Sequence, residues 1–164
     1  MALLQNGYLT TEELKEFGML PSEGRFAKGP VAVVECIQEI PCNPCETACR
    51  VGAIKIGEPI TKLPTIDADA CTGCGLCVAQ CPGLAVFVVD MTYSDAEATV
   101  SFPYEYYPLP KEGDAVVGVR RDGSEIGHVQ VVKVLNPPSF KNTPVVTVAV
   151  PKGMANEVRS IKRA

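Results

Sequence analysis

The chain has 164 residues, of which 46% are hydrophobic and 6% aromatic, and it carries a formal net charge of −4. This length suits one moderate domain or two small ones, with a core built mainly from small aliphatic side chains. No segment approaches the ~18 consecutive apolar residues of a membrane span, and the N-terminus lacks the basic and apolar regions of a secretory leader, so we expect a cytoplasmic protein.

Residues 1–30 are predicted to form an N-terminal arm with one short helix. Thr10 and Glu13 have the spacing of a capping box, in which the two side chains satisfy each other's backbone N–H groups. Gly18 is a plausible stop signal. We therefore expect a helix over residues 11–17 that packs on the rest of this chain; contact with a partner protein is the alternative.

Residues 31–90 contain an internal duplication. Cys49-Arg-Val-Gly-Ala-Ile-Lys-Ile aligns with Cys81-Pro-Gly-Leu-Ala-Val-Phe-Val. Repeats constrain a fold more strongly than local propensity does. Each half is predicted to hold a short strand, a cysteine loop, a helical turn and a second strand. The expected strands are Val31–Val34 and Ala53–Ile56 in the first half, and Leu63–Ile66 and Val86–Val89 in the second.

Residues 91–112 are rich in proline and tyrosine. Pro103, Pro108 and Pro110 alternate with Tyr104, Tyr106 and Tyr107. Because proline cannot donate to a helix or a sheet ladder, this density argues against a helix and against a central strand. We expect a connector whose tyrosines pack on the neighbouring parts; an aromatic surface for a partner protein is the alternative.

Residues 113–164 are predicted to form a small all-β, SH3-like domain closed by a C-terminal helix. Valine-rich runs over Ala115–Arg120 and Glu125–Leu135 flank an Asp-Gly turn, which is a strong hairpin signal. Val145–Val150 is a third expected strand, and the helix is expected at Met154–Lys162. The only histidine, His128, is expected to be a strand or surface residue without a ligand role.

Charge changes sign near the same boundary. Residues 1–110 have a balance of −8, whereas residues 111–164 have a balance of +4. The basic residues at the C-terminus are expected on a solvated helix face, with an acidic partner or a nucleic acid as the alternative.

All eight cysteines lie between residues 36 and 81. The last four read Cys71-x₂-Cys74-x₂-Cys77-x₃-Cys81-Pro82, which is the ligand run of bacterial-type ferredoxins, whose four thiolates hold an iron–sulfur cubane. Zinc and disulfides are the alternatives. Paired C-x₂-C motifs also bind zinc, but a duplicated set of eight favours two clusters, and a chain without an export signal favours metal ligation over disulfides.

On this motif and its duplication, residues 31–90 resemble the two-cluster (2[4Fe–4S]) bacterial-type ferredoxins. The resemblance implies an α+β fold with a duplicated β-α-β unit and two [4Fe–4S] clusters as cofactors. It also implies that each motif supplies the fourth ligand of the other cluster. The implied ligands are Cys36, Cys42, Cys45 and Cys81 for cluster 1, and Cys71, Cys74, Cys77 and Cys49 for cluster 2.

The first motif departs from the family pattern. Five residues separate Cys36 from Cys42 where the family usually has two, and Arg50 replaces the usual proline. If the enlarged loop still brings Cys36 to the cluster, the site holds [4Fe–4S]. If it does not, a [3Fe–4S] cluster is the natural occupant. We favour ligation, because a free cysteine beside a cluster would be open to oxidation.

No nucleotide-binding glycine motif and no catalytic triad is present, so we expect no substrate site and no enzyme activity of the chain itself. A two-cluster domain followed by a small β domain resembles the iron–sulfur subunits of flavin-dependent dehydrogenase complexes of the amino-acid or glycerol-phosphate type. That resemblance implies an electron-transfer subunit in a hetero-oligomer with a flavin-containing dehydrogenase, passing single electrons to an acceptor.

The sequence leaves two alternatives open. One is a free-standing ferredoxin with an appended domain. The other is an iron–sulfur protein that binds nucleic acid through the SH3-like part. The sequence has no run of lysine or arginine, and its aromatic residues stand beside prolines rather than basic residues, so we do not expect nucleic-acid binding.

Overall fold

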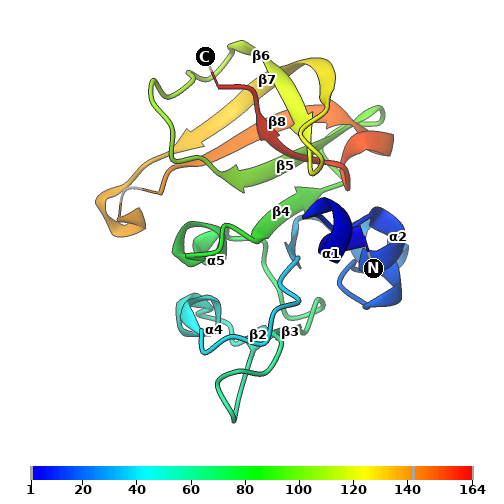
Figure 1. Cartoon of the computed structure of the whole chain (residues 1–164). Helices are drawn as coiled ribbons and strands as arrows, with labels where there is room; N and C mark the ends of the chain where they lie inside the picture. The colour runs from blue at the N-terminus through cyan, green and yellow to red at the C-terminus, as the bar shows by residue number, and fades with distance from the viewer. Residues whose placement is uncertain (1, 142, 164) are drawn as a thin grey trace.

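The computed structural model describes residues 2–141 and 143–163 as a mixed α/β protein (Figure 1). The helices are α1 (Ala2–Asn6), α2 (Thr11–Glu16), α3 (Glu23–Phe26), α4 (Pro44–Ala48) and α5 (Leu76–Gln80), with 3₁₀ turns at Pro138–Phe140 and Lys152–Met154. The strands are β1 (Val31–Val34), β2 (Ile54–Lys55), β3 (Thr65–Ile66), β4 (Val86–Asp90), β5 (Glu97–Pro103), β6 (Ala115–Arg120), β7 (Glu125–Leu135), β8 (Val145–Pro151) and β9 (Val158–Ile161).

The duplicated part pairs its strands across the two halves. β1 of the first half runs antiparallel to β4 of the second, with Val31 opposite Val89, and β2 pairs with β3, with Ile54 opposite Ile66. The four strands predicted for residues 31–90 are therefore confirmed in place, although β2 and β3 are two residues each. The short helices α4 and α5 lie side by side on the outside of these strands (Figure 1).

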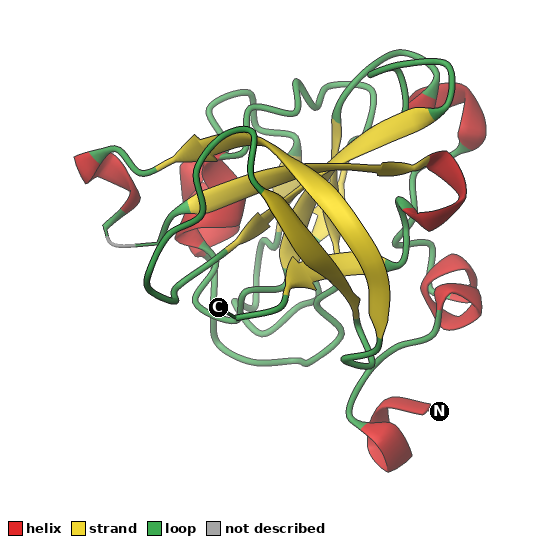
Figure 2. Ribbon diagram, turned by 90° about the horizontal axis from the view of Figure 1, so that it is seen from above, coloured by secondary structure: helices red, strands yellow, loops and turns green. Residues whose placement is uncertain are grey.

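One seven-stranded sheet continues from the cysteine-rich part into the C-terminal part. Its strand order is β1-β4-β5-β8-β7-β6-β9, and β9 also packs against β5, so that the sheet curls on itself (Figure 2). The expected boundaries at residues 90 and 113 thus fall inside a single sheet. The strands of residues 113–164 do not form a separate SH3-like barrel, because β4 and β5 are part of the same hydrogen-bonded ladder.

β1 and β4 are buried on both faces, which explains their uninterrupted apolar sequences. Val31, Val33, Phe87 and Val89 face the interior of the curled sheet. The alternate residues face α4, α5 and the cysteines; they are Ala32, Val34, Val86 and Val88. Because side chains alternate along a strand, β1 and β4 contribute residues to two hydrophobic cores, one on each face. The cysteine loops therefore pack against the outer face of these two strands.

The helix predicted for residues 11–17 forms as α2, but the arm also holds α1 and α3, which were not predicted. Thr10 Oγ1 accepts from the Glu13 N–H at 3.2 Å, and the Thr10 N–H donates to Glu13 Oε2 at 3.0 Å. Gly18 follows with a positive φ of 66°. Leu14 is fully buried, so this helix packs on the chain itself.

The expected connector contains a strand. β5 lies between β4 and β8, and Ala98, Val100 and Phe102 are all 0% exposed. The proline rule failed because Pro103 is the last residue of β5 and the other two prolines follow it, so no central ladder N–H is missing. Tyr104 is buried, whereas Tyr106 and Tyr107 are exposed.

The expected C-terminal helix is also wrong. A 3₁₀ turn over Lys152–Met154 leads into β9, whose Ile161 lies opposite Gly118 of β6. The open edge of β6 offers backbone partners, and Val158 and Ile161 fill the core, so tertiary context overrides the local pattern. The predicted hairpin between β6 and β7 is confirmed, with Gly123 at a φ of 83°. Among the described residues, no helix is long and apolar enough to cross a bilayer.

Candidate metal centre

Four cysteines from both motifs line a first hollow. Cys36, Cys42 and Cys45 meet Cys81 there, although Cys81 belongs to the second motif. The space is bounded by apolar side chains that include Val34, Ile56 and Val86, and by Gln38 and Lys62. The enlarged loop between residues 36 and 42 therefore leaves Cys36 facing the same space as its three partners.

A second hollow is lined by the other four cysteines. Cys71, Cys74 and Cys77 come from the second motif, and Cys49 comes from the end of the first. Ala32, Ile54, Leu76 and Val88 complete its walls. Cys77 is buried, whereas Cys74 is exposed, so this hollow is open to solvent at Cys74.

Short helices position the cysteines in each half. α4 begins at Pro44, where proline's missing N–H costs nothing, and it carries Cys45 on its inner side. α5 follows Gly75, which has a left-handed φ of 78°, and it carries Cys77. Each helix ends at the cysteine that crosses to the other hollow, Cys49 or Cys81.

The buried thiols are hard to ionise without a compensating cation. Burial raises the pKa of Cys77 to about 12 and that of Cys45 to about 11, and the neighbouring thiols contribute to both increases. Burial also raises the pKa of Cys36. Four thiolates in one small apolar hollow repel one another, and a polynuclear iron core supplies the positive charge that stabilises them.

Backbone N–H groups already point at the sulfurs. Cys71 Sγ accepts from Ala32 at 3.4 Å and from Gly73 at 3.5 Å. Cys49 Sγ accepts from Ala53 at 3.2 Å, and Cys81 Sγ accepts from Ala85 at 3.4 Å. Such bonds stabilise a thiolate and orient it toward a cluster. The donors follow each fourth cysteine at the same offset, which repeats the duplication at atomic level.

The donor set fits an iron–sulfur cubane. Among the described residues, no three His, Cys, Asp or Glu side chains stand close enough to hold a single metal ion. A cubane spreads its four ligands over the corners of a cage, so its thiolates stand farther apart than those around one zinc ion. The all-cysteine donor set and the mainly apolar walls suit the softer cluster iron.

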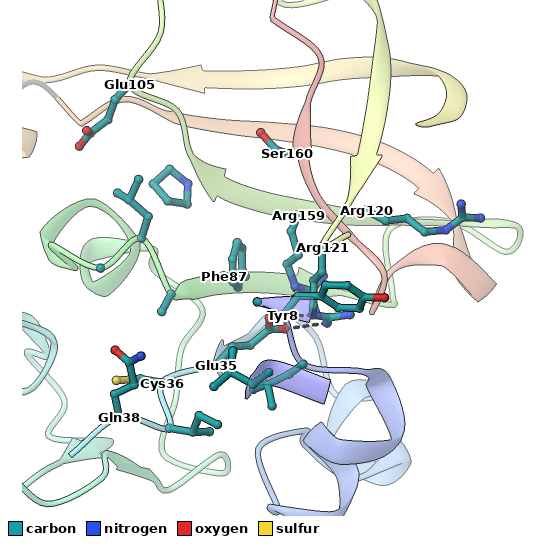
Figure 3. A pocket seen from close by; sticks show the side chains of 18 of the residues that line it. Tyr8, Glu35, Cys36, Gln38, Phe87, Glu105, Arg120, Arg121, Arg159 and Ser160 are labelled. Carbon is teal, nitrogen blue, oxygen red and sulfur yellow. Dashed lines mark hydrogen bonds and ion pairs between the residues drawn. The ribbon is translucent and has the colours of Figure 1, made fainter. Parts of the chain in front are cut away.

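A larger, open hollow borders the first cysteine group at Cys36 (Figure 3). Glu35 lies in its wall with Arg121 and Arg159, which come from the C-terminal part and converge on the carboxylate (Figure 3). Arg121 donates to both Glu35 oxygens, at 2.8 and 2.7 Å, and Arg159 donates to one at 2.8 Å. This ionic cluster ties the end of β1 to the turn after β6 and to β9.

The sequence did not predict the charged residues around the cysteines. Arg159 was expected on a solvated helix face, but it is buried on β9 with its guanidinium 4.8 Å above the ring of Phe87. Arg25 is a second buried arginine, and it contacts the loop of Cys71. Near the cysteines, the apolar residues Ala53, Ile54, Val78 and Val86 are buried, while Val51 and Leu84 are more than one-third exposed.

These two cysteine groups have the arrangement of a ferredoxin-type iron–sulfur domain. Residues 35–85 match the family described as the 4Fe-4S dicluster domain. The chain therefore contains a two-cluster ferredoxin domain and binds two [4Fe–4S] clusters, which makes zinc and disulfide bonds the wrong alternatives. Ferredoxin-type electron carriers are in general not enzymes themselves.

Three curated proteins are similar to parts of this chain. A subunit of the ion-translocating oxidoreductase complex of Methanosarcina acetivorans is 43% identical over 56 residues, covering 34% of this chain and 19% of that protein. Ferredoxin-type protein NapF of Haemophilus influenzae is 32% identical over 66 residues, covering 38% of each. Protein Pixie of Drosophila melanogaster is 26% identical over 103 residues, covering 56% of this chain and 16% of that protein. The chain thus spans well under half the length of these relatives, and no solved structure matches it.

Proposed function

We propose that the eight cysteines hold the two clusters by crossed ligation. Cluster 1 takes Cys36, Cys42, Cys45 and Cys81, and cluster 2 takes Cys49, Cys71, Cys74 and Cys77. The observation that carries this proposal is the sorting of the sulfurs into two hollows, each with three cysteines of one motif and one of the other. The enlarged loop supports Cys36 as a ligand, because it leaves that residue in the wall of the first hollow.

Serine variants test the crossing. If the ligation is crossed, Cys81→Ser perturbs the same cluster as Cys45→Ser, and Cys49→Ser perturbs the same cluster as Cys77→Ser. The hyperfine-shifted β-methylene proton signals of the cysteines report each cluster separately. A Cys81→Ser spectrum that matches the Cys77→Ser spectrum would overturn the crossing. A strong [3Fe–4S] signal in EPR of anaerobically purified wild-type protein would remove Cys36 from the ligand set.

We propose further that the chain is the electron-relay subunit of a complex with a flavin-containing dehydrogenase, of the amino-acid or glycerol-phosphate type. When bound, a [4Fe–4S] cluster exchanges one electron at a time. The chain's own residues hold the clusters, exclude water with apolar walls, and donate N–H bonds to the thiolate sulfurs. A flavin that collects two electrons from a substrate needs such a one-electron outlet.

Three features support a permanent subunit over a free-standing carrier. The arm of residues 1–30 and the strands from β5 to β9 exceed what a two-cluster domain needs. Tyr106 and Tyr107 are 52% and 66% exposed, and tyrosine is enriched at protein interfaces. By its name, the Methanosarcina relative is a subunit of an oxidoreductase complex. A cytoplasmic location belongs to the same proposal, because eight metal-binding thiols require a reducing compartment.

Native anaerobic purification tests the subunit proposal. We expect the chain to co-elute with a flavin-containing protein, and we expect an amino acid or glycerol phosphate to bleach the cluster absorbance of the complex. The same complex depleted of its flavin serves as the control and leaves the clusters oxidised. A monomeric, flavin-free chain that stays alone after native purification would refute the proposal while leaving the two-cluster domain intact.

A further inference from the structure

Arg25 is a buried cation whose hydrogen bonds go to uncharged groups. The residue is 8% exposed and lies on the short helix α3. Its Nε donates to the Ala68 carbonyl, and its Nη1 donates to the Gly29 carbonyl at 3.0 Å. Its Nη2 bridges the carbonyls of Pro30 and Cys71, at 2.9 and 2.8 Å. Within the described part of the chain, the guanidinium is thus held by four neutral backbone oxygens.

No described carboxylate lies within ion-pair distance of Arg25. The carboxylate of Asp69 interacts electrostatically with Arg25, but it is exposed and forms its ion pair with Lys28, at 3.0 Å. Burying a charge without a counter-charge is costly in a protein interior. A compensating negative charge is therefore expected close to Arg25, on the side of Cys71.

A hydrogen bond connects Arg25 to the wall of the second cysteine hollow, because its acceptor residue Cys71 lines that hollow. Arg25 joins the chain just before β1 to the loop that begins at Cys71. In the same place Gly73 is pressed onto Pro30, since a Cβ at residue 73 would lie 2.6 Å from the Pro30 Cβ. The Ala32 N–H, two residues beyond Pro30, donates to Cys71 Sγ. Arg25 thus links, by hydrogen bonds, the two segments that position the Cys71 sulfur.

We propose that Arg25 is the positioning residue and counter-charge of cluster 2, and that it raises the reduction potential of that cluster. The inference rests on the proposed ligation of cluster 2 by Cys71 and its three partners. A [4Fe–4S] core with four thiolates carries a net charge of about −2 when oxidised, and reduction by one electron makes this charge one unit more negative. A buried cation stabilises the more negative state more strongly, so reduction becomes easier.

The first cysteine hollow differs in this respect. The buried arginines near it, Arg121 and Arg159, share the Glu35 carboxylate, and the cation in its own lining, Lys62, is exposed to solvent. The hydrogen bonds of Arg25 reach the loop of Cys71 and no residue that lines the first hollow, so its effect is expected at cluster 2, and the two clusters report independently on one molecule.

The test is a potentiometric titration of the full chain under anaerobic conditions, followed by the hyperfine-shifted cysteine signals of each cluster. Arg25→Gln is expected to lower the reduced-to-oxidised ratio of cluster 2 about tenfold at fixed potential, equivalent to about 59 mV for one electron, and to leave cluster 1 unchanged. Arg25→Lys keeps the charge and is expected to stay within about threefold of wild type. The matched control is Arg50→Gln, which removes an exposed arginine next to Cys49 and is expected to change neither cluster appreciably.

Each outcome decides the proposal. Equal shifts of the reduction potentials of both clusters in Arg25→Gln, or no shift of either potential, would overturn it. If Arg25→Gln does not accumulate, Arg25→Lys still tests the role of the charge, because a tenfold loss of cluster 2 reduction in that variant would overturn it. A wild-type chain without two separately titrating clusters would instead refute the proposed ligation, so the two failures are distinguishable.

Discussion

Gly73→Ala tests how closely the second cysteine loop approaches the chain before β1. Residue 73 has a φ of 65°, and a Cβ there would meet Pro30 Cβ at 2.6 Å and the Pro30 carbonyl carbon and oxygen at 2.8 Å. A left-handed φ costs a non-glycine residue ~1–2 kcal/mol. Forcing a methyl group against backbone adds ~1–3 kcal/mol. The expected loss of folding free energy is thus ~2–5 kcal/mol.

Gly57→Ala is the matched control. Gly57 has a similar φ of 71° but nothing within 4 Å of the added Cβ, so it should lose only the ~1–2 kcal/mol of conformational cost. For a chain of this size, each kcal/mol of lost stability lowers the midpoint of thermal unfolding by ~3 °C. A clash that costs ~2 kcal/mol therefore places the midpoint of Gly73→Ala about 6 °C below that of Gly57→Ala. Anaerobic thermal unfolding at one fixed scan rate measures both. Equal midpoints for the two variants would refute the close approach.

Three further changes follow from the packing and electrostatics. Glu35→Gln leaves Arg121 and Arg159 without their buried carboxylate and should cost ~3–5 kcal/mol, whereas Glu125→Gln, at an exposed ion pair, should cost ~0–1 kcal/mol; equal thermal midpoints would contradict the ionic cluster. Leu14→Ala should lose ~2–5 kcal/mol because Leu14 is 0% exposed, while Leu4→Ala, at 86% exposure, should change little; an unshifted midpoint for Leu14→Ala would mean that the arm is not docked. Hydrogen bonds from the Ser124 hydroxyl and N–H lower the pKa of Asp122, so this turn is stabilised above the ordinary carboxyl pKa and loses that contribution as the pH falls through the lowered value. In Ser124→Ala the pKa of Asp122, measured by a ¹³C titration, should rise, and an unchanged pKa would argue against the hydrogen bond from the hydroxyl.

The sequence predicted the parts of the structure that local chemistry determines. The cysteine spacing and its duplication identified the two-cluster domain, and the capping pair Thr10 and Glu13 located α2. The Asp-Gly turn located the hairpin of β6 and β7. These signals are short-range: a metal motif, a helix cap and a turn each act through residues a few positions apart.

The rest depends on contacts between distant residues. β9 forms because β6 presents a free edge, and β5 is central because β8 pairs with it along its length. Neither partner is visible in the local pattern of residues 97–103 or 158–161. Arg25 and Arg159 look like ordinary surface cations in sequence, yet their acceptors lie 46 and 124 residues away in Cys71 and Glu35. Buried charges of this kind become apparent only once the chain is folded.

The most direct measurement of the central claim is a quantitative reductive titration of the anaerobically purified chain, with iron and acid-labile sulfide determined on the same sample. Two [4Fe–4S] clusters predict about eight iron and about eight sulfide ions per chain, and uptake of about two electrons in separate one-electron steps. Low-temperature EPR should show two magnetically interacting reduced clusters. Stoichiometric zinc, half the iron, or uptake of no more than one electron would contradict the account.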